Sequence, residues 1–155
     1  MAQKNKKTEN VDRNQADPFY RYKMPTLIIG HRHARTYLDN IEEIFACLIK
    51  YDDNATKRSC DEIMKWFNYN MAANVKENFL SGNHPDSKLI DNLHTYIEYY
   101  VLCGECSNPE TTLFVSNKQL WTNCKACGKD HPIENKFPKY NKYLVNLIPV
   151  KIIKK

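Results

Sequence analysis

The sequence predicts an α+β protein, a small mixed α/β domain followed by a four-cysteine zinc ribbon. A chain of 155 residues has room for one domain of ordinary size, or for a small domain with a smaller appendage. Amphipathic helical periods alternate with short β-prone runs in the first two thirds of the chain, and two Cys-x2-Cys pairs follow in a stretch poor in apolar residues. We therefore expect a flexible basic tail over residues 1–18, an α/β domain over 19–100 and a zinc-ribbon domain over 101–155.

The composition is that of a soluble protein. There are 23 Lys and Arg residues against 18 Asp and Glu, and the formal charge of +5 fits an acidic or phosphate-bearing partner as well as it fits mere solubility. No apolar run approaches the roughly 20 residues of a membrane helix, and the first residues do not form a secretory signal. The sequence therefore predicts a cytoplasmic location with no membrane partner, where six cysteines are not expected to form disulfides.

The first elements are a tail and two short strands. Residues 1–18 contain almost no apolar side chain and should stay mobile. From Phe19 on, aromatic and apolar residues become frequent, and residues 27–29 and 35–38 are β-prone. Between these runs, His31 to His33 should form a basic loop.

Three helices have recognisable start signals. Asn40 with Glu43, and Ser59 with Glu62, have the spacing of a capping box, and each pair precedes an apolar stripe of helical period. Pro85 fits the first position of a third helix, which should run to about residue 100. These patterns predict three amphipathic helices that share one core.

Two cysteines fall within the helical periods. Cys47 and Cys60 are expected to be small buried hydrophobic residues, because free cysteine is among the most buried residue types. Residues 75–81 should form a strand between the second and third helices, and His84 a turn. Beyond residue 100 only strands are expected, over 111–116, 119–123 and 143–153.

The last third of the chain needs a stabilising cross-link, because so small a unit seldom folds on apolar burial alone. Cys103 and Cys106 are separated by seventeen residues from Cys124 and Cys127, which is the spacing of a zinc ribbon. Four thiolates fill a tetrahedral Zn²⁺ shell, so the site would be structural and would lower the formal charge to +3. A redox pair and an iron-sulfur site are the rival interpretations. Gly128 should take a positive φ where the chain leaves the metal.

Several segments together resemble the initiation factor 2 beta / initiation factor 5 family. The matching segments are Asn10–Arg13, Asp17, Phe19–Pro25, Ser81–His84, Lys88–Leu89, Val101–Thr111 and Cys124–Gly128. The Phe-Tyr-Arg-Tyr-Lys-Met-Pro segment makes the amino-terminal part of eukaryotic translation initiation factor 5 the nearer match. The family's carboxy-terminal helical-repeat domain has no counterpart before Lys155, so we expect the avidity of a second attachment to be missing.

The resemblance implies a GTPase activator that is not itself an enzyme. Its partner would be the gamma subunit of initiation factor 2 with GTP, on a small ribosomal subunit that carries initiator methionyl-tRNA and mRNA. The family's catalytic arginine corresponds to Arg21, and two supporting basic positions correspond to Arg35 and Lys65. An arginine finger supplied to a partner accelerates hydrolysis about 10³- to 10⁵-fold. The chain has no Gly-x4-Gly-Lys-Ser/Thr loop, so any GTPase must be the partner.

Other interpretations remain open on the sequence. Residues 31–34 are shorter than the family's glycine- and lysine-rich loop, which removes contacts made there. The chain could be a ribosome- and tRNA-binding module like the factor 2 beta subunit, or a mimic that competes without activating. It could also be a zinc-ribbon nucleic-acid binder that uses Phe114, Trp121 and Tyr143, although aromatic residues more often form a ribbon's small core.

Overall fold

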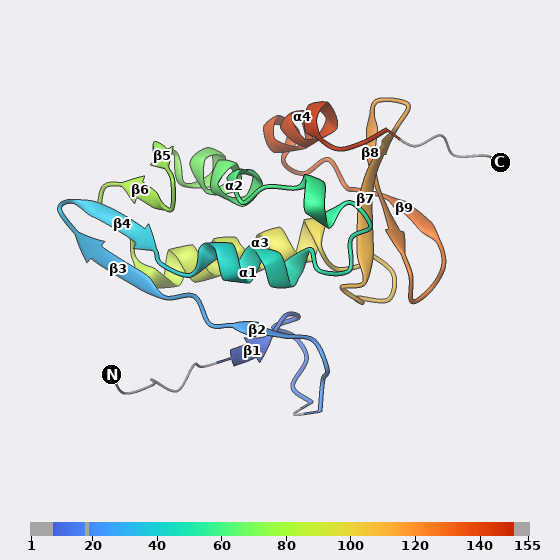
Figure 1. The fold of residues 1–155 in the computed structure, drawn as a ribbon, viewed down its shortest axis with the longest axis horizontal. Coiled ribbons are helices and arrows are strands. Elements are labelled where there is room, and N and C mark those ends of the chain that lie inside the picture. The colour runs from blue at the N-terminus through green and yellow to red at the C-terminus, as the bar shows by residue number, and fades with distance from the viewer. Residues whose placement is uncertain (1–7, 18, 151–155) are drawn as a thin grey trace.

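The protein combines an α/β unit with a three-stranded sheet packed at one end of it (Figure 1). The computed structural model describes residues 8–17 and 19–150. The mixed α/β class followed by a cysteine-bearing sheet is confirmed. No helix in these two ranges is long and apolar enough to cross a membrane.

The described part of the chain begins with a two-stranded hairpin. Strand β1, Thr8–Asn10, pairs antiparallel with β2, Lys23–Pro25. Val11 is buried at 3% exposure and donates its backbone N–H to the Tyr22 carbonyl. The expected flexible tail is therefore wrong for residues 8–17, because pairing with a distant strand cannot be read from local composition. Residues 1–7 and 18 of that tail lie outside the described residues.

A four-stranded antiparallel sheet follows, in the order β3-β4-β6-β5. Strands β3, Ile29–Arg32, and β4, Arg35–Leu38, join through His33 and Ala34, which both have positive φ. The expected basic loop is thus partly strand, with a tighter turn. The single strand expected over residues 75–81 is a hairpin of two short strands, which are β5 at Val75–Lys76 and β6 at Phe79–Ser81.

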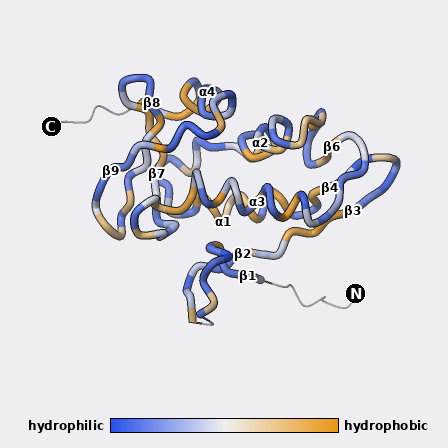
Figure 2. The backbone as a smooth tube through the Cα atoms, turned by 180° about the vertical axis from the view of Figure 1, so that it is seen from behind, coloured by the Kyte–Doolittle hydropathy of each residue, from blue (hydrophilic) through white to orange (hydrophobic). Residues whose placement is uncertain are grey.

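Three helices lie beside this sheet, as the sequence predicts. They are α1 at Ile41–Leu48, α2 at Asp61–Met71 and α3 at Asp86–Tyr100, with a short 3-10 turn at Ala55–Lys57. Orange and blue alternate along α1 and α3 in Figure 2, as expected for helices with one buried face.

Two helix starts differ in detail from the expected capping boxes. Asn40 does not cap α1 but bonds to Ile28 and Thr26, which fastens the strand lead-in to the helix. At α2 the Glu62 carboxylate accepts the Ser59 N–H, which is one half of a capping box.

The second sheet has the order β7-β8-β9. Strands β7, Thr111–Ser116, and β8, Gln119–Cys124, pair antiparallel along their whole length, and β9, Asp130–Pro132, pairs with β8. The first two strands are confirmed within one residue of their expected bounds.

The strand expected over residues 143–153 is wrong for residues 143–147, which belong to helix α4, Pro138–Leu147, whereas Val150 forms an isolated parallel bridge with Val115 of β7. Residues 151–153 of that strand lie outside the described residues. Tyr140 and Leu144 face inward at helical spacing, and the Tyr140 ring lies 5.2 Å from that of Trp66 on α2. Aromatic and β-branched residues favoured a strand locally, but a core contact across more than seventy residues selects a helix.

One hydrophobic core joins both units, and a buried ion cluster crosses between them. Leu38 and Leu93 of the first unit belong to the same buried cluster as Leu113 of β7. Arg58 pairs with Asp52 at 3.1 Å, and Asp52 accepts the Leu113 N–H. The ribbon is therefore packed against the α/β unit by apolar and charged groups together.

Candidate functional site

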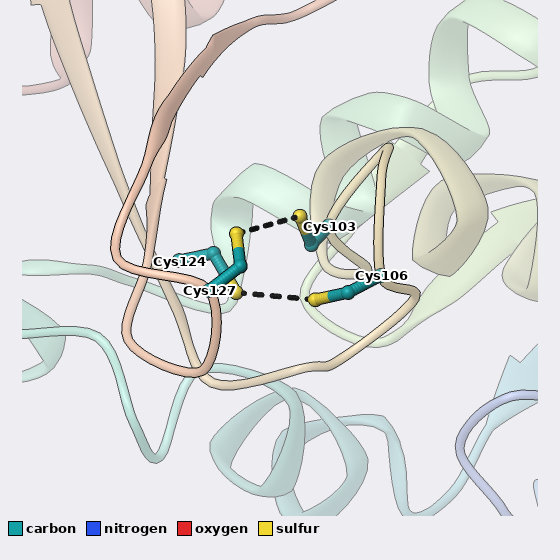
Figure 3. Close-up of side chains that lie close together, drawn as sticks. All are labelled: Cys103, Cys106, Cys124 and Cys127. Carbon is teal, nitrogen blue, oxygen red and sulfur yellow. Dashed lines mark hydrogen bonds between the residues drawn. The ribbon is translucent and has the colours of Figure 1, made fainter.

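Four cysteines from two separate turns converge on one point (Figure 3). The Sγ atoms of Cys103 and Cys127 are 3.9 Å apart, those of Cys106 and Cys124 are 3.5 Å apart, and all four lie within 4.8 Å of one another. A tetrahedral zinc with Zn–S bonds of about 2.3 Å requires sulfur separations of about 3.8 Å. The donor set therefore fits one tetrahedral metal ion and is consistent with zinc.

Backbone hydrogen bonds close each cysteine turn into a hook. Ser107 N–H donates to the Cys103 carbonyl at 2.9 Å, and Gly128 N–H donates to the Cys124 carbonyl at 2.8 Å. Gly128 has φ +72, which confirms the expected left-handed exit. Backbone bonds within each turn therefore orient its two sulfurs, and the Lys125 N–H, which donates to the Glu110 carbonyl, ties the second hook to the segment before β7.

In each hook the pKa of one thiol is raised and that of the other is lowered, and burial is the largest cause of the increase at Cys106. Burial raises the pKa of Cys124 to about 12. Burial also acts to raise the pKa of Cys103, but backbone N–H groups at Cys106 and Glu105 outweigh it and lower that pKa. A hydrogen bond with His131 lowers the pKa of Cys127. A cation is needed to hold the buried Cys124 as a thiolate, which is the state that a metal ion requires.

Cys47 and Cys60 are not part of this cluster. Both are partly buried and pack against the core, so their expected burial is only partial. Burial raises the pKa of Cys60 to about 12 and raises that of Cys47, which keeps both as neutral thiols at neutral pH.

Arg21 lies in the loop that joins β1 to β2, and side chains alternate along this loop. Phe19 is 89% exposed and Arg21 is exposed, whereas Tyr20 and Tyr22 are partly buried. The Asp17 carboxylate accepts the Phe19 N–H at 2.8 Å, so the turn before Phe19 is held. The loop therefore presents a phenyl ring and a guanidinium on its outer side.

The inner tyrosines fasten this loop to the ribbon. The Tyr22 hydroxyl donates to the Glu110 carboxylate and accepts from the Asn108 amide at 3.3 Å. The rings of Tyr20 and Tyr51 each meet Tyr22 edge to face, at 5.5 and 5.7 Å. Since Asn108 directly follows the first cysteine hook, the position of Arg21 depends on the same segment that carries two of the clustered cysteines.

A cavity of about 270 Å³ lies beside Arg21. Lys23 of β2 and Lys50, just after α1, line it together with Arg21. Val11 and Leu48 contribute apolar walls. Sequence reasoning missed both lysines, since each reads as an ordinary exposed residue. The one available signal was that Lys23 stands two residues from Arg21 in the sequence.

The other two expected basic positions stand on other elements. Arg35 begins β4 and its guanidinium lies 4.6 Å from the Phe79 ring centre. Lys65 is on α2, with its Nζ 5.2 Å from the centre of the Tyr69 ring. Figure 1 shows β4, α2 and the β1–β2 hairpin in separate parts of the molecule. The structure therefore does not bring Arg35 or Lys65 beside Arg21.

The three ribbon aromatics expected as alternative contacts are mostly engaged by the fold. Phe114 is 2% exposed and stacks on Trp121 with ring centres 6.3 Å apart. Tyr143 stacks on Tyr140 at 5.8 Å. They act as core residues more than as an open stacking platform.

Comparison with known proteins identifies the family. The family model that describes a domain found in initiation factors 2B and 5 matches residues 12–130, a stretch that holds Arg21 and all four clustered cysteines. This chain belongs to that initiation factor domain family.

Members of this family share much of the chain. Eukaryotic translation initiation factor 5 of Caenorhabditis elegans is 38% identical over 82% of this chain and 30% of its own length. The factor 5 of Saccharomyces cerevisiae is 35% identical over 81% of this chain and 32% of its own length. The chain thus spans about a third of these relatives. Translation initiation factor 2 subunit beta of Archaeoglobus fulgidus is 30% identical over 74% of this chain and 81% of its own length.

Proposed function

We propose that this chain acts in translation initiation by stimulating GTP hydrolysis on the gamma subunit of initiation factor 2, with Arg21 as the catalytic arginine. The observation that carries the proposal is the Arg21 loop, which is fastened on its inner side by Tyr22 and leaves Arg21 exposed on its outer side. The other partners would be the small ribosomal subunit, initiator methionyl-tRNA and mRNA, in the cytoplasm.

The physics of phosphoryl transfer supports this role. Negative charge spreads over the phosphoryl oxygens in the transition state, and a guanidinium with fixed charge and several donors stabilises it. A loop already held in place loses less conformational freedom on insertion than a free tail would. Arg35 and Lys65 would then contact the partner at other surfaces and would not meet the same phosphate as Arg21.

The four cysteines would hold one Zn²⁺ in a structural role. A metal with four sulfur ligands has no open coordination position for water or substrate. Its contribution to function would be indirect, since Cys106 and Asn108 belong to one turn and Asn108 contacts Tyr22.

The test is single-turnover GTP hydrolysis in reconstituted preinitiation complexes. We expect Arg21→Ala to lower the stimulated rate about 10³-fold, the lower range for an arginine finger. Arg13→Ala is the matched control, because it removes the same charge from the same hairpin and breaks only a surface pair with Asp91. Arg13→Ala should stay close to the parent. An Arg21→Ala protein as active as the parent would refute the proposal.

A second candidate is a beta-subunit-like module that binds the gamma subunit without activating it. The observation that favours it is the coverage of the archaeal beta subunit, 81% of which aligns with this chain. This function predicts stable co-purification with the gamma subunit whatever nucleotide is bound, and equal GTPase rates with and without the chain.

A further inference from the structure

The cavity beside Arg21 holds three cationic side chains that the fold leaves available. Arg21, Lys23 and Lys50 line it, and within the described ranges none of the three forms an ion pair with a carboxylate. Lys23 donates a hydrogen bond to the Asn10 amide oxygen, which is a neutral acceptor. The three positive charges are therefore not neutralised within the described part of the protein.

The walls of the cavity add features that suit a phosphate group. No Asp or Glu is among the described lining residues, and the nearby Glu110 carboxylate is engaged by the Tyr22 hydroxyl. The rings of Tyr22 and Tyr51 meet edge to face at 5.7 Å and form one side. An apolar and aromatic wall lowers the local dielectric, which strengthens attraction between the cations and an anion.

Two segments far apart in the sequence supply the three cations, since Arg21 and Lys23 are two residues apart and Lys50 follows α1. Lys23 is on β2, paired with Asn10 of β1, whereas Lys50 follows α1 and its Nζ lies 5.3 Å from the centre of the Tyr51 ring. Arg21 is fastened through Tyr22. Because residues 21–23 and 47–51 are far apart in the sequence and meet here with Val11 and Pro109, the cavity exists only in the folded chain.

We propose that this cavity is a binding site for a terminal phosphoryl group, held by Lys50 and Lys23 together with Arg21. A group with two or more negative charges matches three clustered cations better than a singly charged phosphodiester does. Lys50 and Lys23 are then positioning residues that draw the phosphoryl oxygens toward Arg21. Their part in GTP hydrolysis rests on the proposed function, whereas the affinity for a phosphoryl group belongs to this chain alone.

The first test uses the full chain with its metal and inorganic pyrophosphate as the probe, at constant ionic strength. We expect saturable amide chemical-shift changes in the ¹H–¹⁵N spectrum at Lys23, Lys50 and Tyr51. Lys50→Met should weaken binding about fivefold, the effect of one close unit charge in water. The spectrum also reports folding, and metal content measured after the titration shows that pyrophosphate has not removed the ion.

The matched control is Lys57→Met, which removes an exposed lysine from the 3-10 turn outside the cavity. It should bind pyrophosphate as the parent does. Shifts that spread over the surface without saturation, or equal weakening by Lys57→Met and Lys50→Met, would overturn the site. Dimethyl phosphate should bind more weakly than pyrophosphate, and equal binding would assign the cavity to a phosphodiester such as RNA and refute a terminal phosphoryl ligand.

The GTPase assay separates this site from the proposed function. Lys50→Met should lower the stimulated rate about fivefold through weaker capture of the phosphoryl group, and Lys57→Met should not. Loss of pyrophosphate binding with full stimulation would overturn the role of Lys50 while leaving Arg21 in place. Saturable pyrophosphate binding by a chain that stimulates no hydrolysis would uphold the site and refute the proposed function.

Discussion

The cysteine hooks and the Arg21 loop are built by opposite means, although they touch one another. Each hook is closed by hydrogen bonds between residues four apart, such as Ser107 with Cys103. The Arg21 loop is held by contacts between residues 86 and 88 positions apart, from Tyr22 to Asn108 and Glu110. The metal site is thus locally encoded, whereas the position of the arginine is a property of the whole fold.

This difference predicts how the two regions depend on each other. Each hook is closed within its own turn and the second is also tied to Glu110, whereas the Arg21 loop needs the segment that follows the first hook. Loss of the metal should therefore displace Arg21, whereas a substitution in the loop should leave the metal bound. Two substitutions test this asymmetry, and a third tests a contact that holds the hairpin on α3.

Loss of one metal ligand should have the largest effect. Structural zinc contributes about 10 kcal/mol or more to the folding of small zinc modules. We expect Cys103→Ser to lose the bound ion, to unfold the β7-β8-β9 sheet and to abolish GTPase stimulation. Metal content by atomic emission and thermal unfolding by circular dichroism measure the first two effects.

Cys60→Ser is the control for that substitution, since it changes a partly buried thiol at the start of α2 that is not in the cluster. It should keep one ion per chain. A Cys103→Ser protein with one tightly bound ion and an unchanged unfolding curve would contradict the four-ligand assignment.

Loss of the Tyr22 hydroxyl should have a smaller effect, which changes the Arg21 loop but not the metal site. Tyr22→Phe removes the hydrogen bonds to Glu110 and Asn108, which together contribute about 1 kcal/mol or slightly more in a partly exposed site. We expect a lower urea midpoint and weaker GTPase stimulation, with metal content unchanged. Tyr37→Phe, which removes a hydroxyl from the four-stranded sheet, should leave stimulation as it is. If Tyr22→Phe lost the metal, the dependence would run in both directions.

The smallest effect concerns the contact between Glu9 and His94 that holds β1 on α3. His94 Nε2 lies 2.9 Å from the Glu9 carboxylate, and burial, with the nearby Arg13, lowers the pKa of His94 although Glu9 and Asp91 oppose this. The unfolded chain then binds the proton more readily than the folded one, so stability falls as the pH drops through about 6.5, the unfolded value.

Urea unfolding at pH 7.5 and 5.5 tests the direction of this pH dependence of stability. We expect the parent to lose more stability between the two pH values than His94→Gln, which cannot titrate there. An equal loss in both proteins would mean that other groups carry the pH dependence.

Sequence reasoning succeeded for elements that short-range patterns decide and failed for elements that depend on contacts between distant residues. The three helices and the β7–β8 hairpin were predictable because apolar periodicity over a few residues decides them. Strand β1 and helix α4 were not, since β1 depends on β2 and α4 on a contact between Tyr140 and Trp66. Local propensity was overridden there by tertiary packing.

By itself the sequence determined the family, the helical core and the four cysteines that could hold one metal ion, because each is specified by residue type and short spacing. Only the tertiary structure decided that residues 8–25 form a hairpin, that Arg35 and Lys65 lie away from Arg21, and that Lys50 lies beside it. The physical reason is that a cavity is formed by segments that meet only after folding. The neighbours of Arg21 are set by long-range packing, which residue spacing does not record.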